Sequence, residues 1–172
     1  MKKLLKKIGN TLLGNYSIYK IYSLDLNAYQ IKNALDPDIV YKGNEEETSG
    51  FSGPGSYGFS AINKSDETVL CQCWYWFGDR YKERNFWPLL KNEAKLIDIE
   101  TRKAARGKGI APKLISYSAI NMKKNGFKKL YARIWHSNTP SIKAFTKVGW
   151  KPVCTIIDIY PMGRKIRIKI PL

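Results

Sequence analysis

The chain has 172 residues and a mass of 19.8 kDa, which fits one domain that can bury a core without disulfides or metals. Hydrophobic residues make up 44% and aromatic residues 13% of the sequence, which excludes extensive disorder and fibrous repeats. The longest apolar stretches are shorter than the roughly 18 residues that a membrane-spanning helix needs. Thirty Lys and Arg residues outnumber fourteen Asp and Glu residues, so the sequence predicts a soluble domain with a net charge of +16.

The positive charge is concentrated in the carboxyl-terminal part of the chain. Residues 101–172 carry seventeen basic side chains and one acidic side chain, Asp158, whereas the first hundred residues are nearly neutral. A positive field of this kind attracts anionic partners. It suits nucleic acid, anionic lipid, a polyphosphate cofactor or an acidic substrate, and charge alone does not choose among them.

The three cysteines predict buried, reduced thiols. Cys71 and Cys73 stand two residues apart in an apolar run, and Cys154 is distant from both, so no C-x-x-C motif is present. The single histidine, His136, leaves too few ligands for a structural zinc site, so we expect no metal. Unpaired thiols are typical of a reducing compartment, and we expect a cytoplasmic protein.

The amino terminus, residues 1–14, forms a separate basic amphipathic segment ahead of a domain that covers residues 15–172. The segment opens like a signal peptide, but Lys6 and Lys7 interrupt its apolar run and no small-residue cleavage site follows. On a helix, one face would carry Leu4, Leu5, Ile8 and Leu12. Two interpretations stay open: a terminal helix packed on its own domain, or peripheral contact with an anionic membrane.

The first hundred residues predict mostly strands. Strands are expected at Tyr16–Leu24, Tyr57–Asn63, Thr68–Phe77 and Ala94–Thr101. Asp25 can cap a helix that runs to about Leu35, and the segment Gly43–Gly58 is rich in turn residues.

The remaining residues predict a strand–loop–helix–strand unit followed by a helix and a hairpin. A helix is expected over Ile110–Lys124, a strand over Phe127–Trp135, a second helix from Thr139 to Gly149, and hairpin strands at Val153–Tyr160 and Arg164–Ile170. A right-handed parallel crossover is the default for the first unit. In the last strand Ile166, Ile168 and Ile170 should form a buried face, and Lys165, Arg167 and Lys169 a basic face. The element order predicts an α+β fold, a mixed sheet with helices on its faces.

The segment Arg106-Gly107-Lys108-Gly109-Ile110-Ala111 lies where a strand becomes a helix. Helix starts leave N–H groups unpaired, and glycine lets the backbone approach an anion closely, so this loop suits a phosphate. Its spacing matches neither the P-loop nor the G-x-G-x-x-G motif, and an ordinary basic turn remains the alternative.

This loop resembles the R/Q-x-x-G-x-G/A acyl-CoA loop of the GNAT N-acetyltransferase superfamily. Downstream, Asn138–Ser141 and Ala144–Trp150 resemble the N-x-x-S and A-x-x-K-x-G-F segments of that superfamily, and they follow the strand Phe127–Trp135 as the family order requires. The resemblance covers about Lys95–Lys151, whereas the first ninety residues match only in the order of elements. It implies a single domain with a central, mostly antiparallel sheet flanked by helices.

The resemblance also implies a cofactor site for acetyl-CoA or another acyl-CoA. Backbone groups of Ile99 and Thr101 would bind the pantetheine arm, and the second block would contact the cofactor through Asn138, Ser141, Phe145 and Lys147. The pyrophosphate would be held by Arg106, Gly107, Lys108, Gly109, Ile110 and Ala111.

Phe145 departs from the family pattern, in which a tyrosine at this position often donates a proton to sulfur. Tyr117 or Tyr160 could take that role, the thiolate could leave unassisted, or the protein could be a non-catalytic copy. Glu93, Glu100 and His136 are candidate general bases, as is Asp98. We favour Glu100 and His136, because Glu100 is nearest the thioester end and histidine titrates near neutral pH.

The sequence therefore predicts an acetyl-CoA-dependent N-acetyltransferase that acts on the primary amine of a small, anionic acceptor. Candidates are an amino sugar, a nucleotide sugar or a peptide amine, with the acceptor held by the Asp25–Tyr57 region and by basic residues of the hairpin, Arg164, Lys165 and Arg167. The alternatives are a non-catalytic copy or a basic module that binds nucleic acid or membrane. Nucleic acid is not expected, because Trp74, Trp76, Trp135 and Trp150 fall where core packing is commoner and no nucleic-acid-binding motif occurs.

Overall fold

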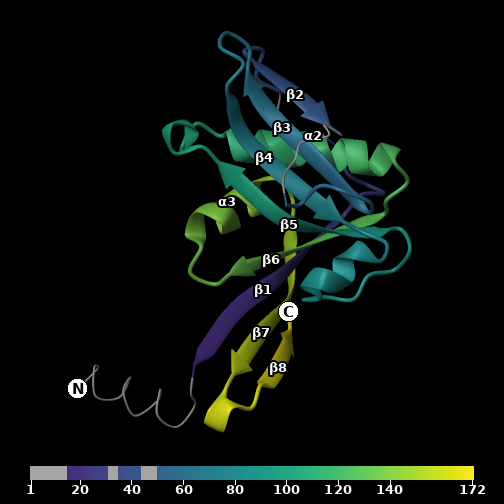
Figure 1. Cartoon of the computed structure of the whole chain (residues 1–172), viewed down its shortest axis with the longest axis vertical. Helices are drawn as coiled ribbons and strands as arrows, with labels where there is room; N and C mark the ends of the chain where they lie inside the picture. Colours follow the sequence, from purple (N-terminus) through teal and green to yellow (C-terminus); the bar gives the residue numbers. More distant parts are fainter. Residues whose placement is uncertain (1–14, 31–34, 44–49) are drawn as a thin grey trace, which may run out of the picture.

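The computed structural model describes residues 15–30, 35–43 and 50–172. The predicted amphipathic segment, residues 1–14, lies outside the described residues. Figure 1 shows a single twisted sheet with helix α2 lying across one face and α3 beside it. The strands are β1 Tyr16–Asp25, β2 Ile39–Gly43, β3 Ser56–Asn63, β4 Val69–Trp76, β5 Glu93–Thr101, β6 Lys129–Trp135, β7 Lys151–Ile159 and β8 Ile166–Pro171. The helices are α2 Ile110–Lys124 and α3 Thr139–Lys147, with short 3-10 turns η1 Arg80–Arg84, η2 Lys103–Ala105 and η3 Pro161–Gly163.

The eight strands follow the order β2-β3-β4-β5-β6-β1-β7-β8. All neighbouring pairs are antiparallel except β5 and β6, which are parallel and are joined through α2. This confirms the predicted mixed, mostly antiparallel α+β sheet. The β5–β6 pairing covers only Glu93–Leu96 and Lys129–Ala132. Beyond Leu96 the two strands separate, which leaves one backbone edge of β5 open.

A bulge in β5 lies close to this separation. Asp98 pairs with Trp74 and Leu96 with Tyr75, so Ile97 is an extra residue in β5. Such a bulge bends the strand and increases its local twist. Leu96 and Ile99 pack in the cluster beneath α2, whereas Ile97 packs in the cluster on the opposite face. The bulge thereby re-aims the end of β5 where it leaves β6.

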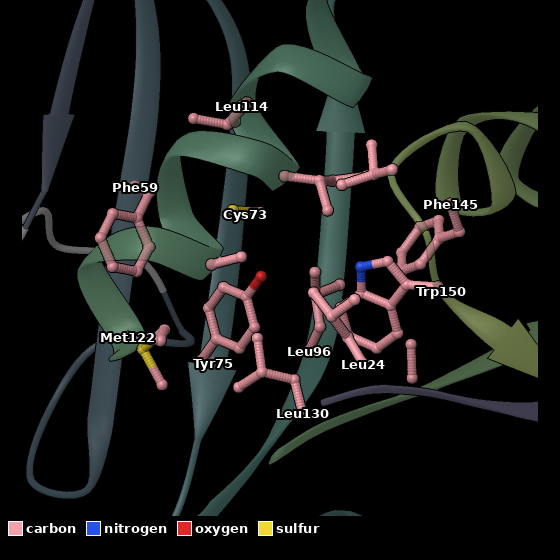
Figure 2. Close-up of a cluster of buried hydrophobic side chains, with 14 of the residues drawn as sticks. Leu24, Phe59, Cys73, Tyr75, Leu96, Leu114, Met122, Leu130, Phe145 and Trp150 are labelled. Atoms are coloured by element: carbon pink, nitrogen blue, oxygen red, sulfur yellow. The ribbon is translucent and has the colours of Figure 1, made fainter. Parts of the chain in front are cut away.

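The main core lies between α2 and the sheet. Leu114, Ile115 and Met122 of α2 are fully buried against Tyr75 and Cys73 of β4. Figure 2 shows Phe145 and Trp150 closing the other end of this cluster, next to Leu24 and Leu96. Burying a side chain of this size contributes about 1.5–3 kcal/mol, so this interface fixes α2 and hence its amino-terminal end.

A second cluster covers part of the opposite face of the sheet. It contains Tyr19, Ile21, Phe86, Tyr131, Cys154 and Ile156. Phe86 belongs to the connection between β4 and β5, which therefore folds over the face opposite α2. This face consequently carries a partly buried aromatic surface rather than a plain solvated one.

Two sequence expectations are corrected. No helix follows Asp25 within residues 26–30 or 35–38; instead the Asp25 carboxylate accepts a hydrogen bond from the Asn27 N–H at 2.9 Å and forms a turn. The ladder also continues past Asp25, because the Leu26 N–H donates to the Lys128 carbonyl at 2.9 Å.

The expected buried face of the last strand is also wrong: Ile166, Ile168 and Ile170 are 47%, 43% and 44% exposed. β8 is an edge strand that extends away from both helices, so no layer covers it in the described part of the chain (Figure 1).

The thiol prediction is confirmed, since Cys71, Cys73 and Cys154 are free and buried. Burial raises the pKa of Cys71 to about 11, which keeps that thiol protonated and unreactive at neutral pH. The described residues contain no group of His, Cys, Asp and Glu side chains placed to hold a metal ion. Neither described helix is long and apolar enough to cross a membrane.

Candidate functional site

A pocket of about 790 Å³ opens where β5 leaves β6, between the amino-terminal ends of α2 and α3. Almost every predicted cofactor residue lines it: Ile99, Thr101, Arg106, Gly107, Gly109, Ile110, Ala111, Asn138, Ser141, Phe145 and Lys147. Lys108 is outside the lining and exposed, between the two loop glycines. Residues that are distant in sequence thus meet at one concave site.

The loop before α2 depends on its two glycines. Gly107 and Gly109 have φ values of +80° and +73°, a conformation that costs other L-residues about 1–2 kcal/mol. Apart from the glycine itself and its two chain neighbours, no heavy atom lies within 4 Å of the position where a Cβ would stand on either residue. The backbone is therefore exposed along the loop, and a ligand can approach it closely.

The first turn of α2 carries uncapped N–H groups. Gly109 is the N-cap residue and supplies no side-chain hydrogen bond, while Pro112 has no N–H of its own. The N–H groups of Ile110 and Ala111 therefore have no partner within the helix, and the positive end of the helix dipole lies at the pocket. Together with the open glycine backbone, this arrangement fits the pyrophosphate of a nucleotide cofactor.

The pocket lining is also basic. Arg106, Lys143 and Lys147 line it, and Glu100 is the single acidic residue in the lining that the structure describes. Lys143 and Lys147 lie one turn apart on α3, so both face the pocket. Lys143 was not predicted from the sequence, although its i, i+4 spacing to Lys147 was a usable signal.

The open edge of β5 offers backbone groups to an extended ligand. The Ile97 carbonyl accepts a hydrogen bond from Arg84 at 3.3 Å, and the Thr101 carbonyl accepts one from Arg106 at 3.0 Å. Ile99 lies between them on the same edge, because backbone groups alternate along a strand. This edge has no strand partner beyond Leu96 among the described residues, so it can pair with an amide-bearing chain.

The start of α3 forms the opposite side of the pocket. The side-chain oxygen of Asn138 accepts a hydrogen bond from the Ser141 N–H at 3.2 Å, which caps the helix. This capping bond uses the amide oxygen of Asn138, which also lines the pocket, and does not use its NH₂ group.

Phe145 lies in the wall of the pocket. It is 2% exposed and packs edge-to-face on Trp150, with ring centres 5.0 Å apart (Figure 2). Tyr117 instead packs on Tyr41 with ring centres 5.5 Å apart, and Tyr160 precedes the hairpin turn. No tyrosine belongs to the described lining, so neither candidate lies beside Phe145 in the pocket wall.

The three candidate general bases, Glu100, Glu93 and His136, lie at different places in the structure. Glu100 lines the pocket. Glu93 stands at the other end of β5, about 23 Å away along the strand, and accepts hydrogen bonds from the Leu90 N–H at 2.8 Å and the Tyr131 hydroxyl at 3.3 Å. His136 points its Nδ1 at the Ile18 carbonyl of β1, 3.0 Å away, on the side of β6 remote from β5.

Asp98 is a second carboxylate near the open end of β5. It pairs with Trp74, two residues before Glu100, and it is half-buried. Burial and the neighbouring charge of Glu100 raise the pKa of Asp98. Asp98 and Glu100 are therefore an acidic pair, two residues apart, at the end of β5 that separates from β6.

Comparisons with known proteins agree with this geometry. The model of the acetyltransferase (GNAT) family matches residues 17–150, whereas no curated protein matches the chain. An N-acetyltransferase from Sphaerobacter thermophilus superposes with a TM-score of 0.63 at 10% identity, over 100% of this chain and 59% of that one. A GNAT-family acetyltransferase from Colwellia psychrerythraea gives 0.58 at 14% identity, over 91% of this chain and 60% of that one. This chain thus spans about three fifths of the length of each neighbour.

Proposed function

The chain belongs to the GNAT acetyltransferase family, and on that premise we propose that it transfers an acetyl group from acetyl-CoA to the primary amine of an acceptor. The observation that carries the proposal is the pocket at the splay of β5 and β6, which joins an open glycine loop, an uncapped helix start and an unpaired strand edge. The free, buried thiols agree with action in a reducing, cytoplasmic environment.

Each wall of the pocket has a defined task in this proposal. The N–H groups of Gly107–Ala111 would hold the pyrophosphate, with Arg106 and Lys147 adding charge-assisted contacts. The backbone of Ile99–Thr101 would hold the amide-bearing arm. Phe145 would exclude water from the thioester end, because its ring is apolar and fixed by Trp150.

When bound, acetyl-CoA would supply a thioester. The amine nitrogen would form a bond to its carbonyl carbon, and the carbon–sulfur bond would break. Glu100 is placed to remove the proton that the nitrogen loses, because it is the acidic side chain in the described pocket lining. Asp98, whose pKa is raised, would be a second carboxyl group that can carry a proton near Glu100. An N–H group on the open edge of β5 would donate to the carbonyl oxygen as negative charge develops there.

The leaving sulfur needs no tyrosine in this scheme. A thiol has a pKa of about 8.5, so its thiolate is stable enough to leave near neutral pH and take a proton from solvent afterwards. The Phe145 ring is therefore compatible with turnover, with protonation of sulfur following the bond-breaking step.

The test is acetyl-CoA titration by calorimetry, followed by thiol release with polyamines, amino sugars, nucleotide-linked amino sugars and peptide amino termini. Glu100→Gln should lower kcat about 100-fold or more and leave the Kd for acetyl-CoA unchanged, because a general base acts on the amine alone. Glu93→Gln and His136→Gln are matched controls that should keep kcat within about twofold. Equal losses in all three variants, or no acetyl-CoA binding by the wild type, would refute the proposal.

A further inference from the structure

Arg133 occupies a distinctive place on the sheet face opposite α2. It follows Ala132, the last β6 residue that pairs with β5, and so stands at the mouth of the splay. Its pairing with Ile21 places it on the side of the second core cluster. The guanidinium lies 5.4 Å from the ring centre of Tyr19 and 5.5 Å from those of Phe86 and Trp135.

These ring contacts position Arg133 without using its hydrogen-bond donors. In the described part of the chain the guanidinium makes no ion pair and no hydrogen bond, although the side chain is exposed. A guanidinium carries five N–H donors in a rigid fork that matches a carboxylate or phosphate. The aromatic contacts therefore hold a preorganised anion-binding group at the opening between the strands.

The Tyr19 hydroxyl is a second, independent feature of this place. Tyr19 is 2% exposed, and its Oη has no hydrogen-bond partner among the described residues. A buried hydroxyl without a partner costs free energy that an acceptor atom would recover. Burial and the charge of Asp158 raise the pKa of this hydroxyl, whereas Arg167, Arg133 and Lys165 lower it, so three of the four charged groups that act on it are cations.

Lys95 adds a second cation without a carboxylate partner. It is fully buried, donates to the Arg84 carbonyl at 3.3 Å, and lies 4.7 Å from the centre of the Phe86 ring that Arg133 also contacts. The nearest carboxylate of the hairpin, Asp158, is already taken by Arg167 at 2.7 Å and Lys165 at 3.0 Å. Neither Lys95 nor Arg133 therefore has an ion-pair partner among the described residues.

The same face carries the acidic pair at the end of β5. Asp98 and Glu100 pair with Trp74 and Gln72, whereas the intervening Ile99 packs toward α2. An amine beside Glu100 and an anionic group beside Arg133 would span the opening between β5 and β6. We infer that the acceptor carries a carboxylate or phosphate close to its reacting amine, and that Arg133 and Tyr19 bind this anionic group. The inference rests on the proposed acetyl transfer and names the acceptor class.

In this inference Arg133 binds the anionic group of the acceptor, in place of the basic hairpin residues that were predicted to do so. Lys165 and Arg167 are ion-paired with Asp158, so their charges are committed within the hairpin rather than offered to a ligand. Lys64 is exposed in the turn between β3 and β4 and serves as a control for loss of one positive charge.

The experiment compares wild type, Arg133→Gln and Lys64→Gln on two matched pairs of amines. Glycylglycine against glycylglycinamide tests a carboxylate, and glucosamine 6-phosphate against glucosamine tests a phosphate. Calorimetry without acetyl-CoA measures binding, and thiol release measures kcat/KM. The wild type and Lys64→Gln should prefer the charged member of one pair at least about tenfold. Arg133→Gln should lose that preference and keep the wild-type Kd for acetyl-CoA.

Two outcomes separate the inference from the proposed function. A binding preference that depends on Arg133, with no thiol release from any amine, would support the anion site and contradict acetyl transfer. Thiol release with no preference for the charged amines, or with a preference that survives in Arg133→Gln, would support acetyl transfer and overturn the anion site.

Discussion

Lys95 and Asp158 are both buried charged side chains, and the surroundings shift the pKa of each for a different reason. Asp158 accepts hydrogen bonds from Arg167 at 2.7 Å and 2.9 Å, and these bonds lower the pKa of its carboxyl to about 2. Lys95 has no carboxylate beside it in the described residues; burial and the charge of Arg133 lower its pKa to about 8. One charge is stabilised by folding and the other is destabilised by it.

Replacing Lys95 with methionine should stabilise the fold at neutral pH. The unfolded chain binds the Lys95 proton more tightly than the folded chain, so stability rises with pH between about 8 and 10.5. Below pH 8 the buried charge costs up to about 3 kcal/mol, of which Lys95→Met should recover about 1–3 kcal/mol because methionine fills a similar volume. Thermal unfolding of wild type and variant from pH 6 to pH 10.5 measures this difference.

The stability difference should be largest below pH 8 and shrink toward pH 10.5 as wild-type Lys95 loses its proton. Lys64→Met, in an exposed turn, is the control and should shift the melting temperature little at any pH. A destabilised Lys95→Met variant, or a difference that does not vary with pH, would contradict the assignment of Lys95 as an uncompensated buried cation.

At the scale of single residues, the sequence predicted the lining of the pocket better than the positions of the candidate bases. Loop residues such as Gly107 and Gly109 line the pocket as anticipated, because their positive φ and close approach are consequences of local chain geometry. Glu93 begins β5, at the end of the strand opposite Glu100, whereas His136 follows β6 and its ring nitrogen contacts the Ile18 carbonyl of β1. Which way a strand-end side chain turns depends on partners distant in sequence, such as Ile18 for His136.

At the scale of elements, the loop before α2 gives a prediction that separates binding from stability. Gly109→Ala should cost about 1–2 kcal/mol of folding free energy, since φ is +73° and a methyl group meets no atom within 4 Å. The methyl group would project into the space from which an anion approaches the backbone. The Kd for acetyl-CoA should therefore rise about tenfold or more, a change that calorimetry measures.

Gly126→Ala provides the matched control. Gly126 follows the other end of α2, has a φ of +86° and also has open space at its Cβ position. It should lose similar stability and keep the wild-type Kd. Equal affinities for both variants would show that the loop does not hold the cofactor.

The elements themselves were predictable where periodicity was strong. The α2 bounds Ile110–Lys124 agree with the apolar spacing and with the glycine on either side. The short strand Ile39–Gly43 was missed, because five residues at the sheet edge show little alternation. The isoleucines of β8 alternate as a half-buried strand would, yet remain exposed because burial depends on which layer lies above them.

At the scale of the whole molecule, the two halves of the candidate site differ in how they are assembled. The cofactor pocket is built almost entirely from residues 99–147, one continuous stretch of the basic region. The proposed acceptor face combines Tyr19, Phe86, Lys95 and Arg133 from four separate elements or connections. A contiguous site leaves a motif in the sequence, whereas one assembled across the sheet appears only once the strand order is known.

The central claim is that the splayed end of β5 and the start of α2 together hold acetyl-CoA. Amide chemical-shift mapping of the isotopically labelled chain during acetyl-CoA titration tests it most directly. The account predicts that the largest shift changes fall on the backbone amides of Ile99–Thr101 and Arg106–Ala111, with smaller changes at the start of α3. Saturating acetyl-CoA that leaves these amides unmoved, or moves chiefly those of β7 and β8, would contradict it.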